Sequence, residues 1–142
     1  MYYRVVRAVL DTSVVVSAFR SRNGASFAIL ERVAARRFAP LVSTALFLEY
    51  EDVLQREDQR AVHGLSRLEV LFALRELAAL CEPVETHFRW RPQTSNPADD
   101  MVLEAAVNGR AEFLVTHNVG DFVGAAGKFQ FRVVAPGAFS RG

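Results

Sequence analysis

The sequence has 142 residues, the length of one ordinary domain, which is enough to bury a hydrophobic core without disulfides to stabilise it. Hydrophobic residues make up 51% and charged residues 23%, a composition that excludes disordered and fibrous proteins. The formal net charge is only +1, so any attraction to nucleic acid must come from a local patch of the surface.

The first forty residues predict a strand and a helix, joined by a short apolar segment. Val5–Leu10 is rich in Val, ends at Asp11 and predicts a mostly buried strand. Residues 12–19 are small and apolar, and the polar residues that follow break this pattern. Ser26–Arg37 has apolar residues three apart and two arginines in its last turn, so it predicts a helix.

The middle of the chain predicts a second strand and two further helices. Pro40–Ser43 predicts the strand, and a helix capped by Ser43 or Thr44 follows it to about residue 54. Gln55–Gly64 is the most polar stretch and is expected to be a loop. The run Ser66-Arg67-Leu68-Glu69 has the spacing of a capping box, which predicts a helix through residue 80.

The last third predicts three short strands around one long helix. Cys81–Val84 is a weak strand candidate, and the basic segment Glu85–Ser95 after it is irregular. Asn96 is a good helix cap and Pro97 suits the first helical position, so a helix is expected from here to Gly109. The remaining predictions are a strand at Phe113–Val115, a short helical turn at Asp121–Gly127 and a strand at Phe131–Val134.

Strands and helices alternate along the whole chain, which predicts an α/β fold with a parallel sheet and helices on both faces. No linker divides the sequence, so we expect one domain over residues 1–142. Six phenylalanines are expected in its core: Phe19, Phe27, Phe47, Phe72, Phe113 and Phe131.

Two acids follow predicted strands, where an open parallel sheet binds its ligands. Asp11 comes directly after the first strand, and Asp121 lies a few residues beyond the strand that ends at Val115. The competing interpretation of Asp11 is a helix cap, a position for which Asp is well suited. Position alone does not separate the two roles.

Glu49 lies within or beside the apolar stripe of its predicted helix, since its neighbours three and four residues away include Leu46 and Val53. A carboxylate that faces a core is costly unless it is paired or binds a metal. A salt bridge to one of the arginines is the alternative to a metal-binding role.

Asp99 and Asp100 are separated by their helical positions. Asp99 is the third residue after the Asn96 cap, where a carboxylate favours the helix dipole, so its expected role is mainly capping. Asp100 shares its face with Leu103 and Val107 and is expected to point toward the sheet and the site.

Clustered carboxylates raise one another's pKa, and a hard cation such as Mg²⁺ or Mn²⁺ removes that cost by taking oxygen ligands. Zinc is the less suitable metal, because one cysteine and three scattered histidines have no zinc-site spacing. The sequence therefore favours a site for Mg²⁺ or Mn²⁺.

Four segments, in order, resemble those of PIN domains, most of all the toxin-type (VapC-like) proteins of bacterial toxin–antitoxin pairs. The segments are LDTSVVVSAF at Leu10–Phe19, STALFLEYEDVL at Ser43–Leu54, NPADDMVLEAAV at Asn96–Val107 and LVTHNVGDF at Leu114–Phe122. The resemblance implies a five-stranded parallel sheet and an acidic pocket that binds Mg²⁺ or Mn²⁺ and cleaves RNA. It also implies a cognate antitoxin partner and a homodimer.

The resemblance carries roles over to individual residues. Asp11, Glu49 and Asp100 match the three most characteristic acids. Because Asn118 stands where many PIN domains have an acid, the fourth carboxylate is expected to be Asp121. Small polar residues beside the acids are expected to support the site: Thr12, Ser13, Thr116 and Asn118.

A PIN-like scaffold without activity that binds a protein or RNA is the main alternative, but it need not retain the acids. A haloacid-dehalogenase-type site requires an Asp where Ser13 stands, and a response-regulator receiver requires a late Lys that Lys128 does not match in position. Both phosphoryl-transfer alternatives are disfavoured.

Arg20 and Arg22 follow the first motif and are candidates for contact with RNA phosphates. Trp90, between two arginines, is interpreted as a surface residue, because one aromatic makes no stacking ladder. The lone Cys81 excludes an internal disulfide, and no secretory signal or apolar run of about 20 residues is visible. We expect a cytoplasmic protein with no membrane contact.

Overall fold

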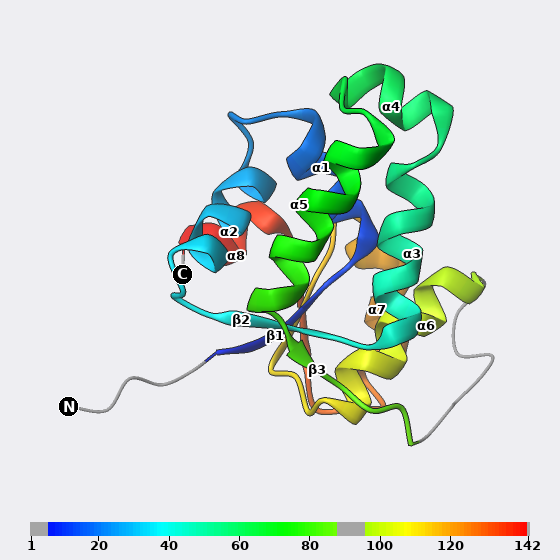
Figure 1. The fold of residues 1–142 in the computed structure, drawn as a ribbon. Coiled ribbons are helices and arrows are strands. Elements are labelled where there is room, and N and C mark those ends of the chain that lie inside the picture. The colour runs from blue at the N-terminus through cyan, green and yellow to red at the C-terminus, as the bar shows by residue number, and fades with distance from the viewer. Residues whose placement is uncertain (1–5, 88–95, 142) are drawn as a thin grey trace.

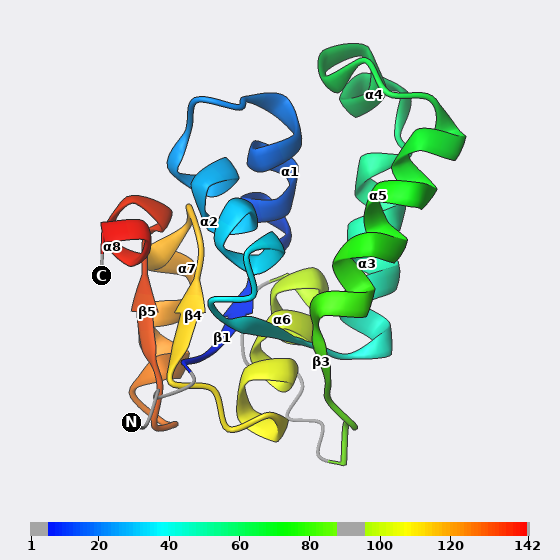
Figure 2. The same ribbon diagram turned by 60° about the vertical axis from the view of Figure 1, so that its left-hand side comes forward.

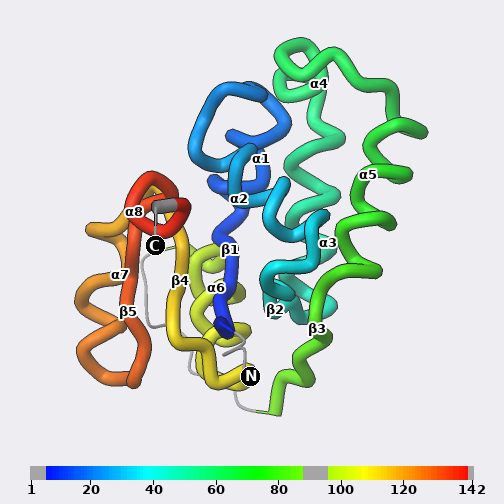
Figure 3. Tube along the Cα trace, turned by 90° about the vertical axis from the view of Figure 1, so that its left-hand side faces the viewer, coloured from blue at the N-terminus to red at the C-terminus, as the bar shows by residue number. Residues whose placement is uncertain are grey.

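The computed structural model describes residues 6–87 and 96–141 and has the α/β architecture that the sequence predicts. Its five strands form one parallel sheet in the order β3-β2-β1-β4-β5, which Figure 3 shows side by side. The strands are β1 (Arg7–Leu10), β2 (Ala39–Val42), β3 (Glu82–Pro83), β4 (Phe113–Val115) and β5 (Arg132–Val134). Since all strands run the same way, their carboxyl ends meet at one edge of the sheet.

Helices cover the sheet and extend beyond it (Figure 1). They are α1 (Thr12–Arg20), α2 (Ala25–Ala34), α3 (Thr44–Leu54), α4 (Glu57–His63), α5 (Arg67–Leu80), α6 (Pro97–Asn108), α7 (Val119–Ala126) and α8 (Pro136–Arg141). In Figure 3, α6 lies behind β1 and β4, while α2 and α8 lie in front of the sheet and against each other. Figure 2 shows α3, α4 and α5 as a helical arm beside the sheet, with α4 at its tip.

The predicted helix starts are confirmed by their capping geometry. The Ser43 side chain accepts a hydrogen bond from the Leu46 amide at 3.1 Å and caps α3. Ser66 and Glu69 form the reciprocal capping box of α5. Asn96 caps α6 by accepting from the Ala98 amide. The predicted strand starting at Val5 and the segment around Trp90 fall partly or wholly outside the described residues.

The prediction of a loop at Gln55–Gly64 is wrong, because this stretch contains the helix α4. None of its residues is buried, so it lacks the apolar stripe by which an amphipathic helix is recognised. Its ends explain the helix instead: Glu57 and Asp58 occupy the first turn, and Gly64 adopts the left-handed conformation that terminates it.

The prediction that Phe72 lies in the core is also wrong, since 59% of its surface is exposed. Helix α5 turns Val70, Leu74 and Leu77 inward, so its buried face is rotated away from Phe72. Phe131 is buried, and Phe19, Phe47 and Phe113 pack against the core, as predicted. Phe27 is half-buried.

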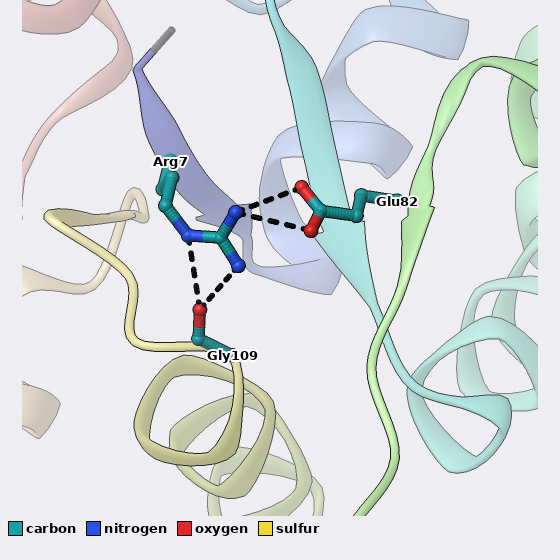
Figure 4. A network of polar contacts seen from close by, with 3 residues as sticks. All are labelled: Arg7, Glu82 and Gly109. Carbon is teal, nitrogen blue, oxygen red and sulfur yellow. Dashed lines mark hydrogen bonds and ion pairs between the residues drawn. The ribbon is translucent and has the colours of Figure 1, made fainter.

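A polar network at the amino end of β1 joins the sheet to the end of α6 (Figure 4). The Arg7 guanidinium donates to both carboxylate oxygens of Glu82 on β3 at 3.0 Å and to the Gly109 carbonyl at 2.7 Å. At Gly109 a Cβ would lie 2.9 Å from Leu41 and from Val84, so the close approach of α6 to the sheet requires glycine.

Replacing Arg7 with Met is expected to lower the free energy of unfolding by about 1–2 kcal/mol. The ion pair is partly exposed and contributes little, but the Gly109 carbonyl loses its side-chain donors. Chemical denaturation of both proteins measures the difference. Glu82→Gln keeps the bonds to Gly109 and should lose less; an equal loss in both variants would contradict this account.

Among the described residues, no helix combines the length and the apolar character that crossing a bilayer demands.

Candidate active site

The Asp11 side chain, at the carboxyl end of the central strand β1, is held by two hydroxyl groups. It is 4% exposed, and its Oδ2 atom accepts hydrogen bonds from Ser13 Oγ and Thr116 Oγ1, both at 2.7 Å. Asp11 occupies the N-cap position of α1, but its side chain makes no capping hydrogen bond. The capping interpretation of this carboxylate is therefore wrong.

The groups that hold Asp11 are themselves fixed. Thr116 is fully buried at the end of β4, and its Oγ1 atom accepts from the Asn118 amide at 2.9 Å. Ser13 Oγ accepts from the His117 amide at 3.2 Å. The buried Tyr50 hydroxyl donates to the Leu10 carbonyl and fixes the backbone just before Asp11. One carboxylate oxygen of Asp11 is thus oriented by hydroxyls from two segments.

Glu49 on α3 lies within electrostatic reach of Asp11. Its side chain is half-buried, and its pKa is raised, first by desolvation and then by the charges of Asp52 and Asp11. Arg56 lowers that pKa, but its ion pair is with Asp52, at 2.8 Å. No ion pair to Glu49 is found in the described parts of the chain, so the salt-bridge alternative is not seen.

Asp99 joins the same cluster, which the sequence did not predict. Its pKa is raised from the usual value to about 6, mainly by burial and then by the charges of Asp11, Asp121 and Asp100, in that order. Asp99 does lie in the first turn of α6, as predicted, but it also lies within electrostatic reach of the other acids. The adjacent pair Asp99-Asp100 was the sequence signal that could have indicated this.

The other predicted residues surround this cluster. Asp100 is buried on α6, while Asp121 is exposed in the first turn of α7. Asn118 is exposed at the N-cap position of α7 without a capping bond from its side chain. Arg20 is exposed at the last residue of α1, about 13 Å along the helix from Asp11, and Arg22 is exposed in the turn that follows.

Two residues that the sequence did not single out connect α2 to the site. The buried Ser26 hydroxyl lies 3.0 Å from His117 Nε2, while the His117 amide donates to Ser13. The His117 side chain is otherwise exposed. No sequence pattern predicts this link, because the two residues are 91 positions apart.

The donor chemistry of the cluster suits a hydrated Mg²⁺ or Mn²⁺ ion. Among residues 6–87 and 96–141, no three His, Cys, Asp or Glu side chains are close enough to form a metal site by themselves. Mg²⁺ does not require such a cage, since it usually binds one or two carboxylates and keeps several waters. Thr12 Oγ1, beside Asp11, is buried and lacks a hydrogen-bond partner within the described residues, so it is available to a metal-bound water.

A comparison with protein families agrees with this arrangement of a parallel sheet and acids at its carboxyl edge. The sequence model of the PIN domain matches residues 7–120, about four fifths of the chain. The chain belongs to the PIN domain family. No curated protein matches the sequence. PIN domains are usually nucleases and generally use divalent metals. The match includes Asp11, Glu49 and Asp100 and stops one residue before Asp121.

Proposed function

We propose that this PIN domain is an endoribonuclease that depends on Mg²⁺ or Mn²⁺ and acts as the toxin of a bacterial toxin–antitoxin pair. The observation that carries the proposal is the Asp11 carboxylate, buried and oriented by Ser13 and Thr116, with Glu49 and Asp99 electrostatically coupled to it. Asp11, Glu49, Asp100 and Asp121 are the proposed ligand and catalytic groups, with Asp99 added to their cluster.

The chain's own residues position the reactants in this proposal. The hydroxyls of Ser13 and Thr116 hold Asp11 Oδ2. The Asp11 side chain is therefore fixed in one orientation, and so is its other carboxylate oxygen. When bound, Mg²⁺ or Mn²⁺ would polarise a phosphoryl oxygen and lower the pKa of a bound water. Glu49 and Asp99, with their raised pKa, can accept a proton near neutral pH more readily than an ordinary carboxylate.

The partners belong to the same proposal and rest on the resemblance to toxin-type PIN proteins. They are an RNA substrate, contacted by Arg20 and Arg22, a cognate antitoxin whose segment covers the acidic pocket, and a second copy in a homodimer. The cytoplasm is the proposed location, where RNA and a reduced Cys81 would both be found.

The test is incubation of the purified protein with single-stranded RNA and Mn²⁺, in parallel with a chelator. We expect cleavage products with 5′-phosphate ends only when the metal is present. Cleavage that persists in the chelator would exclude the metal-dependent mechanism. Absence of cleavage with every RNA tested would favour the alternative, a scaffold that binds protein or RNA.

Thr116→Val is expected to slow RNA cleavage about tenfold and to destabilise the fold by about 1–2 kcal/mol. The valine has nearly the same shape, but Asp11 Oδ2 and the Asn118 amide each lose a partner. Thr116→Ser retains the hydroxyl and should behave like the original protein. Initial cleavage rates and denaturation curves measure both effects; a valine variant with full activity would show that Thr116 does not position Asp11.

A further inference from the structure

A cavity of about 680 Å³ lies on the face of the sheet that α2 and α8 cover. Its strand residues are Val6, Phe113 and Arg132, at the amino ends of β1, β4 and β5, and Val134 at the carboxyl end of β5. Residues from the end of α2 and from α8 complete the lining. Asp11 and Thr116, by contrast, follow the carboxyl ends of β1 and β4. None of the clustered acids lines the cavity, so the two sites have different residues. Figure 2 shows α8 beside α2 at the β5 side of the sheet.

The charges that line this cavity are mostly positive. Three arginines and one glutamate line it: Arg32, Arg37, Arg132 and Glu112. Together they have a formal excess of two positive charges. The Arg32 guanidinium has a structural role, because it donates to the carbonyls of Phe139 and Ser140 and so ties α2 to α8.

Arg37 and Arg132 have no such role. Both side chains are exposed, and neither makes an ion pair or a side-chain hydrogen bond within the described residues. Arg37 is held at the cavity by its backbone: its amide donates to the Arg32 carbonyl at 2.9 Å, after Arg36 in a left-handed conformation with φ of 59°. The cavity thus presents two guanidinium groups that are available to an anion.

The rest of the lining is aromatic. Phe139 packs edge to face against Phe38, with ring centroids 5.4 Å apart, and against Phe113, with centroids 5.7 Å apart. All three phenylalanines line the cavity. Phe38 is buried, whereas Phe113 and Phe139 are partly exposed. Aromatic rings pack against flat aromatic ligands in the same arrangements that they form with one another.

We propose that this cavity binds a nucleotide, with its phosphate on Arg37 and Arg132 and its base against the three phenylalanines. Arginine forks match phosphate oxygens in geometry and charge, and bases stack on aromatic side chains. The volume falls in the range of small-molecule sites, about 300–1,000 Å³. A carboxylate peptide would also satisfy the arginines, but the three rings favour a base.

A ligand with a phosphate and a base can be either a free mononucleotide or the terminal nucleotide of an RNA chain. The proposal does not depend on the proposed ribonuclease function, since no acid of the cluster lines the cavity. An RNA bound here would contact residues outside the acidic cluster and would add affinity without taking part in the chemistry.

The experiment measures binding by titration calorimetry in a buffer with chelator, so that no metal at the acidic cluster can hold phosphate. The ligands are adenosine 5′-monophosphate, adenosine, inorganic phosphate and a short single-stranded RNA with a 5′-phosphate. We expect the mononucleotide or the RNA to bind, and adenosine and phosphate to bind at least about tenfold more weakly.

Arg37→Glu and Arg132→Glu are expected to weaken nucleotide binding by about tenfold to a hundredfold. Arg75→Glu, an equal charge change at an exposed position of α5 outside the cavity, is the control and should bind normally. Phe139→Leu keeps an apolar side chain at a partly buried position and should weaken the mononucleotide more than inorganic phosphate. Circular dichroism verifies that each variant is folded.

The outcomes separate the alternatives. Binding of the RNA but not of the mononucleotide supports the site and identifies the RNA end as its source. The proposal is overturned if neither binds, or if Arg75→Glu weakens binding as much as the two cavity variants do.

Discussion

Asp11→Asn is expected to reduce RNA cleavage by about a thousandfold or more while the protein remains folded. The asparagine oxygen can still accept the hydrogen bonds from Ser13 and Thr116, so the local structure is kept. What is lost is the negative charge at the centre of the acidic cluster, which is the property that a divalent cation requires. Initial cleavage rates at saturating Mn²⁺ measure the loss.

The same variant has an opposite effect on stability, which separates loss of chemistry from loss of fold. The Asp11 charge raises the pKa of both Glu49 and Asp99, so these carboxylates repel one another in the metal-free protein. In a chelator, the melting temperature of Asp11→Asn should therefore equal or exceed that of the original protein. A variant that unfolds early would instead assign Asp11 a structural role.

Glu76→Gln provides the matched control, because Glu76 is an exposed carboxylate on α5, away from the cluster. It should cleave RNA at the original rate. Cleavage by Asp11→Asn at a rate close to that of this control would contradict the proposed site.

The fold could be predicted from the sequence because its strands are short apolar runs and its helices begin with recognisable caps. Val9 and Leu114, for example, lie in strands whose residues are buried on both faces of a covered parallel sheet, and these read as continuous apolar runs. Ser66 and Asn96 marked two helix starts to the residue. Local chemistry was enough for these elements.

Features without an apolar pattern could not be predicted in this way. The helix α4 has no buried residue, so its signal was limited to the charges at its ends and to Gly64. Phe72 has the composition of a core residue, but only the packing of α5 against its neighbours determines which side of that helix is covered. Both errors arise from tertiary context, which overrides the intrinsic preference of a segment.

The candidate site shows the same division. Asp11 was found because it directly follows a strand, and helix periodicity separated Asp100 from Asp99. That separation assigned Asp99 mainly to the helix dipole, a role that explains its position in the first turn but not its surroundings. Its proximity to Asp11 and Asp121 depends on how α6 and α7 approach β1, and no local spacing encodes this.

The stability of the metal-free protein is expected to depend on pH, and Asp99→Asn is expected to abolish most of that dependence. The pKa of Asp99 is about 6 in the folded protein and about 3.8 when the chain is unfolded, so folding favours the protonated carboxyl. Below pH 4 the group is protonated in both states and costs nothing. As the pH rises from about 4 to 6 the folded protein loses stability, by about 1 kcal/mol once solvent screening of this partly exposed side chain is allowed for.

The variant lacks this charge, so in a chelator it should be more stable than the original protein at pH 7 and nearly equal to it at pH 4. Denaturation curves at several pH values measure the difference, and Glu76→Gln should retain the original pH dependence. Parallel curves for Asp99→Asn and the original protein would show that Asp99 is not coupled to the other acids.

The negative charge of Asp99 destabilises the metal-free protein, but it should stabilise the protein when a divalent cation is bound. Mn²⁺ should raise the melting temperature of the original protein more at pH 7 than near pH 4, where Asp99, with its pKa of about 6, is protonated. Without the Asp99 charge, about a hundredfold more Mn²⁺ should be needed for half-maximal RNA cleavage, with the maximal rate recovered at high metal. If the metal requirement is unchanged but the maximal rate falls, Asp99 acts on the reaction and not on the metal, because only a loss of cation affinity can be offset by adding more cation.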